Sequence, residues 1–208
     1  MEERLTRQAR KSQTRERLID AAAIVFAQRG FETATLDEVA AAAGYTKGAV
    51  YSNFASKTDL FIALIERRVE TQTAEFNATY GGRDLAAAAR ELQNVPDRES
   101  ESDRQWLLLA MEFWLHAMRE ERARVLMAEQ YERARMASAN LVASFYESSG
   151  REPPLAPRDF AIVIESIAIG QAIQAALDPD AINMSLQGRV IAMLMGLPIS
   201  PSATAAQE

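Results

Sequence analysis

Residues 35–54, TLDEVAAAAGYTKGAVYSNF, constrain the fold more than any other stretch because they predict two short helices joined by a tight turn. Thr35 and Glu38 have the spacing of a capping box, in which the hydroxyl and the carboxylate satisfy backbone N–H groups at a helix start. Gly44 suits the left-handed conformation that ends such a helix. Thr46 is a good N-cap for the next helix, so only two residues separate the pair. This arrangement predicts a helix-turn-helix of the DNA-binding kind.

The second helix of the pair divides its side chains between two faces, since each residue advances about 100° around a helix. One face is small and mostly apolar and should pack on the preceding helix: Ala49, Val50, Asn53 and, at its edge, Phe54. The other carries a cation, an aromatic hydroxyl and a glycine: Lys47, Gly48, Tyr51 and Ser52. A glycine inside a helix costs about 1 kcal/mol relative to alanine, and close approach of a partner is one reason to accept that cost. Taken alone, the pattern also fits an amphipathic helix with a solvated face. The flanking residues decide between this interpretation and a helix that reads DNA.

Those flanking residues resemble the DNA-binding domain of the tetracycline-repressor (TetR) family over roughly the first 60 positions. The matching series is the helix ending Phe26-Ala-Gln-Arg-Gly30-Phe31, then Thr35, Gly44, Thr46-Lys47-Gly48-Ala49-Val50-Tyr51, Phe54 and Ser56-Lys57-Thr58-Asp59-Leu60. A dense, ordered series of this kind is more specific than one short motif. Asn53 departs from the pattern, because many relatives have a histidine there, but asparagine can also donate to a phosphate.

The resemblance implies a role for eight residues. Those matched to phosphate contacts are Thr35, Thr46, Tyr51, Asn53 and Lys57. Those matched to base edges or the groove floor are Tyr45, Lys47 and Gly48, with Tyr51 also a candidate for contact with a thymine methyl group.

The charge distribution fits a protein that meets phosphates at one end only. Residues 4–17 contain six basic side chains and one acidic side chain. Residues 1–60 have nine basic and eight acidic residues, a net charge of +1, whereas the remainder has 14 basic and 21 acidic residues, a net charge of −7. A basic arm on an acidic body favours contact with nucleic acid through the arm, although a solvated, disordered tail has the same composition.

The rest of the chain predicts an all-α protein, since helical spacing recurs and no alternating strand pattern appears. We place a basic arm and a three-helix DNA-binding domain in residues 1–56, and a helical effector-binding and dimerisation domain in residues 57–208. The expected helices outside the central pair are about 12–29, 56–80, 84–93, 104–118, 121–148, 158–177 and 183–195. The helix from residue 56 starts beside the DNA-reading pair and ends in the second domain, so it is the expected mechanical link.

Several classes of site are excluded by composition. The chain has no cysteine and a single histidine, His116, which excludes disulfides, thiolate zinc sites and a histidine-rich metal centre. No cofactor is expected. No uninterrupted apolar run approaches the roughly 20 residues of a membrane span, and the charged N-terminus is unlike a signal peptide. We therefore expect a cytoplasmic protein.

The last two long helices predict a homodimer. The segments 158–177 and 183–195 are apolar on more than one face, and helices of this kind must be buried. Two terminal helices rarely find enough cover within one small domain, so we expect a four-helix bundle made by two protomers. The resemblance points the same way, because the family dimerises through its last two long helices. A fully intramolecular core is the alternative.

Residues 106–118, WLLLAMEFWLHAM, suggest a site for a small molecule, because apolar walls with a few fixed polar groups are typical of such sites. The resemblance implies an effector pocket in this domain, and the candidate lining residues are Trp106, Phe113, Trp114, His116, Tyr131 and Phe145. Each of them is also a plausible core residue. Glu112 and His116, four residues apart, are alternatively a pair on a partly exposed stripe.

These features together predict a one-component transcriptional regulator: a repressor that binds a palindromic operator as a homodimer and that a small-molecule effector releases. Two alternatives belong to other classes. One is a ligand-independent or architectural DNA-binding protein. The other is an enzyme with Glu112 and His116 as acid and base, which the absence of any nucleophile, metal or phosphate-loop motif disfavours, so no catalytic residue is assigned.

Overall fold

The computed structural model describes residues 7–80, 93, 101–183 and 185–199, and every regular element in these ranges is an α-helix. The all-α prediction is confirmed. The chain divides into two compact units. The first unit comprises Met1–Gln72 with Gln105–Ala128, and the second comprises Thr73–Arg104 with Glu129–Glu208. The predicted domain boundary after residue 56 stays a prediction, and the expected helix 84–93 lies outside the described ranges except for its last residue.

The first unit is built on α1 (Arg7–Thr33), which begins several residues before the predicted start near Ser12 or Thr14. The basic arm is therefore helical from Arg7, because arginine, lysine, glutamine and alanine all favour helix. Apolar residues at helical spacing form its buried face: Leu18, Ile19, Ala22, Val25 and Phe26. The helix kinks where a stop was predicted, at Gly30, whose φ of 74° and ψ of 167° are not helical. Phe31 after it is fully buried.

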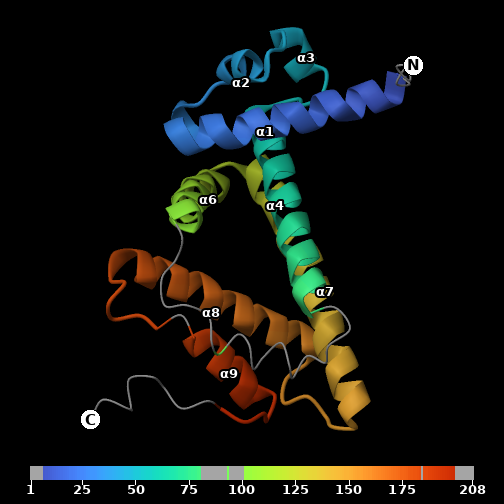
Figure 1. Ribbon diagram of the computed structural model, residues 1–208, viewed down its shortest axis with the longest axis vertical. Helices are drawn as coiled ribbons and strands as arrows, with labels where there is room; N and C mark the ends of the chain where they lie inside the picture. The colour runs from blue at the N-terminus through green and yellow to red at the C-terminus, as the bar shows by residue number, and fades with distance from the viewer. Residues whose placement is uncertain (1–6, 81–92, 94–100, 184, 200–208) are drawn as a thin grey trace. The chain divides into compact units, whose positions relative to one another are not determined.

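The predicted helix-turn-helix consists of α2 (Leu36–Ala43) and α3 (Lys47–Tyr51). Thr35 and Glu38 form both hydrogen bonds of the predicted capping box. Gly44 is left-handed at φ 71°, and the Thr46 hydroxyl accepts from the Ala49 N–H. In Figure 1, α2 and α3 lie along one side of α1, and α4 (Lys57–Tyr80) leaves from the other side. Both the pair and its tight turn are confirmed, although α3 ends earlier than expected.

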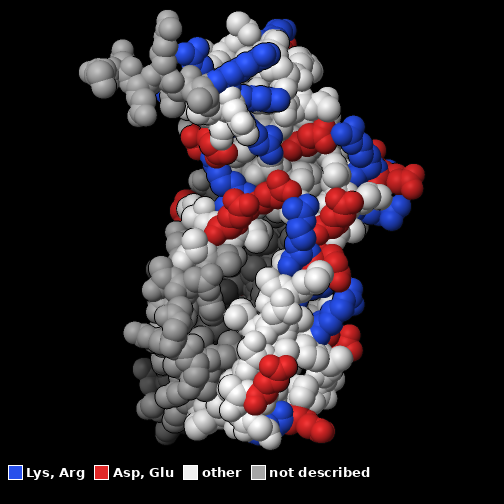
Figure 2. Space-filling model, turned by 90° about the vertical axis from the view of Figure 1, so that its right-hand side faces the viewer, with Lys and Arg blue, Asp and Glu red and all other residues white. Residues whose placement is uncertain are grey.

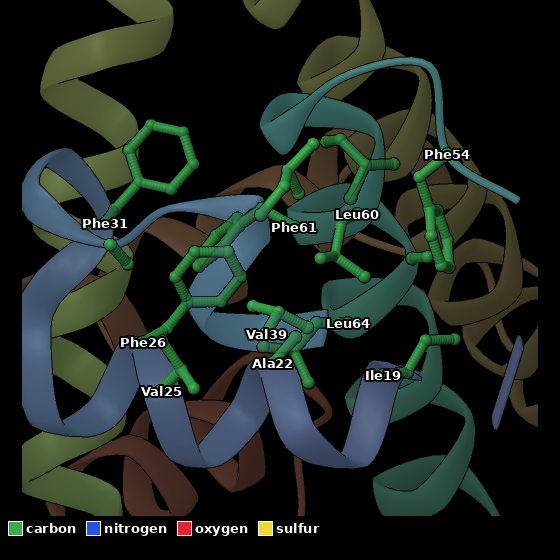
Figure 3. Close-up of a cluster of buried hydrophobic side chains, with 14 of the residues drawn as sticks. Ile19, Ala22, Val25, Phe26, Phe31, Val39, Phe54, Leu60, Phe61 and Leu64 are labelled. Carbon is green, nitrogen blue, oxygen red and sulfur yellow. The ribbon is translucent and has the colours of Figure 1, made fainter. Parts of the chain in front are cut away.

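An aromatic core joins α1 to α4 and to α6 (Glu101–Arg119). Phe61 packs edge-on against Phe26 and Phe31, with ring centroids 5.3 and 5.1 Å away, and stacks on Phe113 at 4.4 Å. Figure 3 shows Phe26 from α1 and Phe61 and Leu64 from α4 converging on Val39 of α2. This shared core fixes the base on which the helix-turn-helix is mounted.

The second unit has a separate core. It is formed by α7 (Glu121–Ser149, from Glu129 onward), α8 (Pro157–Leu177) and α9 (Leu186–Leu194), with Val142, Phe145, Tyr146, Phe160, Ile191 and Met195 buried together. The Tyr146 hydroxyl donates to the Leu194 carbonyl at 3.0 Å. In Figure 1, α8 and α9 lie side by side. α9 is shorter at both ends than the predicted 183–195.

α8 is long and apolar enough to cross a membrane if judged by length and composition only, with a mean hydropathy of 1.7. It is the one helix of the described ranges that passes this test. The sequence did not suggest a span because Glu165 interrupts its apolar run. That carboxylate accepts from the Arg135 Nε at 2.9 Å, so the middle of α8 makes a polar contact within its own unit.

Candidate nucleic-acid interface

The fold anchors α3 by its inner face and leaves its outer face open. Val50 is fully buried and Phe54 nearly so, and the Arg15 guanidinium lies 4.5 Å from the centre of the Phe54 ring. On the outer face Lys47, Gly48, Tyr51 and Ser52 are exposed, and Tyr51 is 58% exposed although aromatic. The predicted division of the helix into two faces is confirmed.

The packing of α3 gives no reason for a glycine at position 48. A Cβ built there would meet only the Thr46 hydroxyl, at 3.8 Å. Gly48 also has no positive φ. Glycine is therefore neither a steric nor a backbone requirement of the folded chain, and its cost within a helix needs an external explanation. Close approach of a partner to the outer face of α3 is one such explanation.

Lys47 is placed by an acidic residue that the sequence analysis missed. Its ammonium donates to the Asp37 carboxylate on α2, and both side chains are exposed. The hydrogen bond and charge of Asp37 raise the pKa of Lys47, so this lysine is charged at neutral pH. Asp37 lies ten positions earlier, and no local spacing rule pairs two residues so far apart. The contact orients a cation on the open face of the pair.

Several predicted phosphate contacts already have partners in the folded chain. The Thr35 N–H donates to Glu38 at 2.9 Å. The hydroxyls of Thr35 and Thr46 each accept from a backbone N–H group as helix caps. The Asn53 amide nitrogen donates to the Ala49 carbonyl at 2.8 Å, so its side chain folds back on α3. Tyr45 is half-buried against the first core. Of the predicted DNA-binding residues, Lys47, Gly48 and Tyr51 are thus the most accessible to a partner on the outer face of α3.

Lys57 is the most firmly engaged of the predicted site residues. Its ammonium donates to the Glu32 and Ala34 carbonyls at 2.8 and 3.1 Å and lies 4.7 Å from the centre of the Phe31 ring. Burial lowers the pKa of Lys57, and the nearby Glu32 carboxylate opposes that shift. An ammonium has three N–H donors, so one is left for a further acceptor. The structure places this residue at the start of α4, against the end of α1.

Basic side chains gather at the helix-turn-helix end of the first unit. Figure 2 shows lysine and arginine crowded over this end, while acidic and basic side chains alternate over the helices below. Arg7, Arg10, Lys11, Arg15 and Arg17 all belong to the N-terminal part of α1. Such a surface attracts polyanions through long-range electrostatics.

The six predicted ligand-lining residues are distributed over both units. Trp106, Phe113, Trp114 and His116 belong to the first unit, and Tyr131 and Phe145 to the second. Trp106, Phe113 and Trp114 line a small pocket of about 100 Å³ within the first unit, together with Ile65, Arg68, Val69, Ala110 and Met127. Arg68, whose guanidinium lies 4.6 Å from the centre of the Trp106 ring, was missed, because nothing in the sequence of α4 distinguishes it.

Several of the candidates also have partners within their own unit. Phe113 is fully buried in the aromatic core, and Phe145 belongs to the second core. The Arg135 guanidinium lies 5.1 Å from the centre of the Tyr131 ring. His116 and Glu112 both contact the end of α1: Nδ1 of His116 is 3.4 Å from a Glu32 carboxylate oxygen, and Glu112 accepts from the Phe31 N–H at 2.6 Å. Within the described ranges, no three acidic or histidine side chains are grouped to hold a metal ion.

Known proteins that resemble this chain are transcriptional regulators. AcrR of Shigella flexneri is 33% identical over 104 residues, which are 49% of this chain and 48% of that protein. The repressor BepR of Brucella suis is 44% identical over 59 residues, 28% of each chain. The chain thus spans about half the length of the first relative and about a quarter of the second.

Solved structures share the fold at low identity. A TetR-family regulator from Rhodococcus sp. superposes with a TM-score of 0.75 at 20% identity, over 88% of this chain and 99% of that one. Salmonella enterica GusR gives 0.68 at 21% identity, over 94% and 98%. A transcriptional regulator from Saccharomonospora viridis, solved in complex with choline, gives 0.65 at 16% identity, over 92% and 100%.

Two family descriptions match successive parts of the sequence. Residues 18–64, from within α1 into α4, match the bacterial regulatory proteins of the tetR family. Residues 92–195, which include α6 to α9, match the C-terminal domain of BetI-type transcriptional repressors. Both parts of a one-component regulator are thus present in the expected order, and the chain belongs to the TetR family of bacterial regulatory proteins.

Proposed function

We propose that the protein is a DNA-binding transcriptional repressor that reads operator DNA with α3. The observation that carries this proposal is the outer face of α3, where Lys47, Gly48 and Tyr51 are exposed on a helix anchored by Val50 and Phe54. An exposed aromatic residue and a glycine that packing does not require are both explained by a partner that comes close to the backbone. The BetI-type match and the named repressor among the relatives favour repression over activation.

The side chains of α3 would divide reading from anchoring. Lys47, Gly48 and Tyr45 would lie against base edges or the groove floor, since lysine can donate to guanine acceptors. Thr35, Thr46, Tyr51, Asn53 and Lys57 would contact phosphates, which fix register without reading sequence. Lys57 would do so with its one remaining donor. The basic N-terminal part of α1 would add charge along the backbone.

A homodimer would present two copies of α3 to one duplex. Apolar side chains of the second unit remain exposed in the single chain: Leu177 is 82% exposed, Met193 57% and Leu186 47%. Only 22% of the apolar window of α8 is buried, which leaves surface for a second copy to cover. The operator would then be a near-palindrome with half-sites about 34–36 Å apart, or a multiple of that spacing.

A small-molecule effector would lower the affinity for DNA in the cytoplasm. A regulator of similar fold was solved with choline, and this chain has a small, largely apolar pocket of its own between α4, α6 and α7 in the first unit. α4 would transmit the change. An effector can act only by preferring one arrangement of the protein, so it must bind more weakly to the DNA-bound protein.

Footprinting on the DNA upstream of the protein's own coding region tests the proposal. A protected near-palindrome is expected, and it would serve as a release assay for effectors. Lys57→Ala should weaken binding to all sequences and reduce the salt dependence by about one counterion, whereas Lys47→Ala should change the preferred bases. No protected site, together with equal binding to unrelated duplexes, would contradict the proposal.

A further inference from the structure

Residues 30–34, from the kink in α1 at Gly30 to the residue before the Thr35 cap of α2, form a turn that is fixed by side chains from two other helices of the first unit. This turn sets the direction in which the helix-turn-helix leaves α1. Phe31, at its centre, is fully buried, with its ring centroid 5.1 Å from that of Phe61 and 5.0 Å from that of Phe113. Lys57 of α4 donates to the Glu32 and Ala34 carbonyls. These contacts tie the turn to α4 and α6 through both its backbone and its side chains.

Glu112 of α6 makes the closest of these contacts. The kink at Gly30 interrupts the helix, and the Phe31 N–H donates to Oε2 of Glu112 at 2.6 Å. A Cβ added at Gly30 would come within 2.6 and 2.8 Å of the two carboxylate oxygens. The glycine therefore makes room for the carboxylate, and the carboxylate satisfies the amide that the kink frees. A hydrogen bond of a backbone amide to a charged acceptor is stronger than one to a neutral acceptor.

His116 adds a second contact from the same face of α6, one helical turn later. Its Nδ1 lies 3.4 Å from a Glu32 carboxylate oxygen, and its ring centroid is 4.9 Å from that of Phe31. The other face of α6 carries Ala110 and Trp114, which line the pocket. Because α6 contacts the pocket on one face and the turn on the other, a small rotation of α6 caused at the pocket would also move the side chains that contact the turn.

We propose that Glu112 is a positioning residue for DNA recognition. By accepting the Phe31 N–H it holds the turn in the geometry that orients α3, so that the reading face is ordered before DNA arrives. The proposal rests on the DNA-binding function proposed above. Without the carboxylate, the turn must be ordered during binding. The free-energy cost of ordering the turn reduces the affinity for the operator, because operator recognition needs one orientation of α3. It does not reduce the non-specific attraction between basic side chains and phosphates.

The test compares Glu112→Ala and Glu112→Gln with Glu121→Ala, a matched control whose side chain is 85% exposed in the same unit. The probes are the duplex that the wild-type protein enriches most from a random library and an unselected duplex. Glu112→Ala should lose about tenfold in affinity for the enriched duplex, roughly the effect of one charge-assisted hydrogen bond, with unchanged affinity for the unselected one. The affinity of Glu112→Gln for the enriched duplex should lie between those of wild type and Glu112→Ala, and the Glu121→Ala control should bind as wild type does. A folded Glu112→Ala protein with wild-type affinity for the enriched duplex would overturn the proposal.

Amide hydrogen exchange of Phe31 tests the same contact without depending on the folding of Glu112→Ala. The Phe31 amide should be protected in the wild-type protein and should exchange faster in Glu112→Gln, while amides in the middle of α4 keep their protection. Rapid exchange of the wild-type Phe31 amide would overturn the proposal. If no duplex is enriched by the wild-type protein, the proposed function fails instead, and the exchange measurement still decides whether Glu112 fixes the turn.

Discussion

Two glycines of the first unit share a positive φ but differ in ψ and in their surroundings, since ψ is 167° at Gly30 and 28° at Gly44. Gly30 has a φ of 74° and Gly44 a φ of 71°. A Cβ at Gly44 would meet nothing within 4 Å, whereas one at Gly30 would collide with Glu112. The sequence predicts both as helix ends, but only the structure shows that Gly30 meets a steric requirement in addition to a backbone one.

Gly30→Ala should therefore be more destabilising than Gly44→Ala. The alanine at position 44 adds only the strain of a left-handed L-residue, about 1–2 kcal/mol. The alanine at position 30 adds more backbone strain, because φ 74° with ψ 167° is a region essentially restricted to glycine, and it also displaces the Glu112 carboxylate from the Phe31 N–H. Urea unfolding of the two variants measures the difference directly. Equal losses would contradict both the stricter backbone requirement at Gly30 and the steric effect of Glu112 beside it.

The capping box at the start of α2 should make part of the stability depend on pH. Hydrogen bonds from the Thr35 backbone and hydroxyl lower the pKa of Glu38 below its ordinary value of 4.5. A carboxylate with a lower pKa in the folded state stabilises that state above pH 4.5, and the effect is lost as the pH falls through the folded pKa. As the pH falls below about 4.5, wild type should lose more stability than Glu38→Gln. Parallel stability curves of the two proteins would contradict this.

Residues whose roles are set by near neighbours in the chain could be predicted, and residues with distant partners could not. Thr35, Gly44 and Thr46 act within one helical turn, so spacing alone was enough. Lys57 bonds carbonyls 25 and 23 positions earlier, and Glu112 bonds an amide 81 positions earlier. Such contacts depend on how helices pack, which local sequence patterns do not encode. The apparent pairing of Glu112 with His116 misled for the same reason.

Helix α6 shows at the scale of the element what composition leaves open. Its aromatic, methionine-rich sequence predicted a ligand site, and only part of one face lines a pocket. Phe113 is fully buried in the aromatic core and also borders the pocket, while Trp114, one residue later, is half-buried at the pocket. The rotation of a helix about its axis decides between these roles, and it is set by the neighbouring α1 and α4.

Substituting the neighbouring Phe113 and Trp114 of α6 should separate the effect of a fully buried ring from that of a partly exposed one. Phe113→Ala removes a fully buried ring and should lower the free energy of unfolding by about 3–5 kcal/mol. Trp114→Ala should cost clearly less because its side chain is already partly exposed. Denaturant unfolding monitored by circular dichroism provides both values. A larger loss for Trp114→Ala would mean that the assignment of faces on α6 is wrong.

At the scale of the whole molecule, the apolar surface of α8 and α9 is the feature that the single chain leaves unexplained. Met193→Glu should shift the protein towards monomer, since it places a charge on a side chain that is 57% exposed in one copy. Met118→Glu is the matched control, because Met118 is 73% exposed on α6. Sedimentation velocity over a concentration series distinguishes the two. If neither substitution changes the mass, α8 and α9 do not form the interface.

The account depends on α3 being presented twice to one duplex. Sequencing the duplexes that the purified wild-type protein enriches from a random library at moderate salt tests this most directly. We expect a near-palindromic motif whose half-sites lie about one helical turn, or a multiple of it, apart. Enrichment of no motif over random competitor DNA would contradict the account.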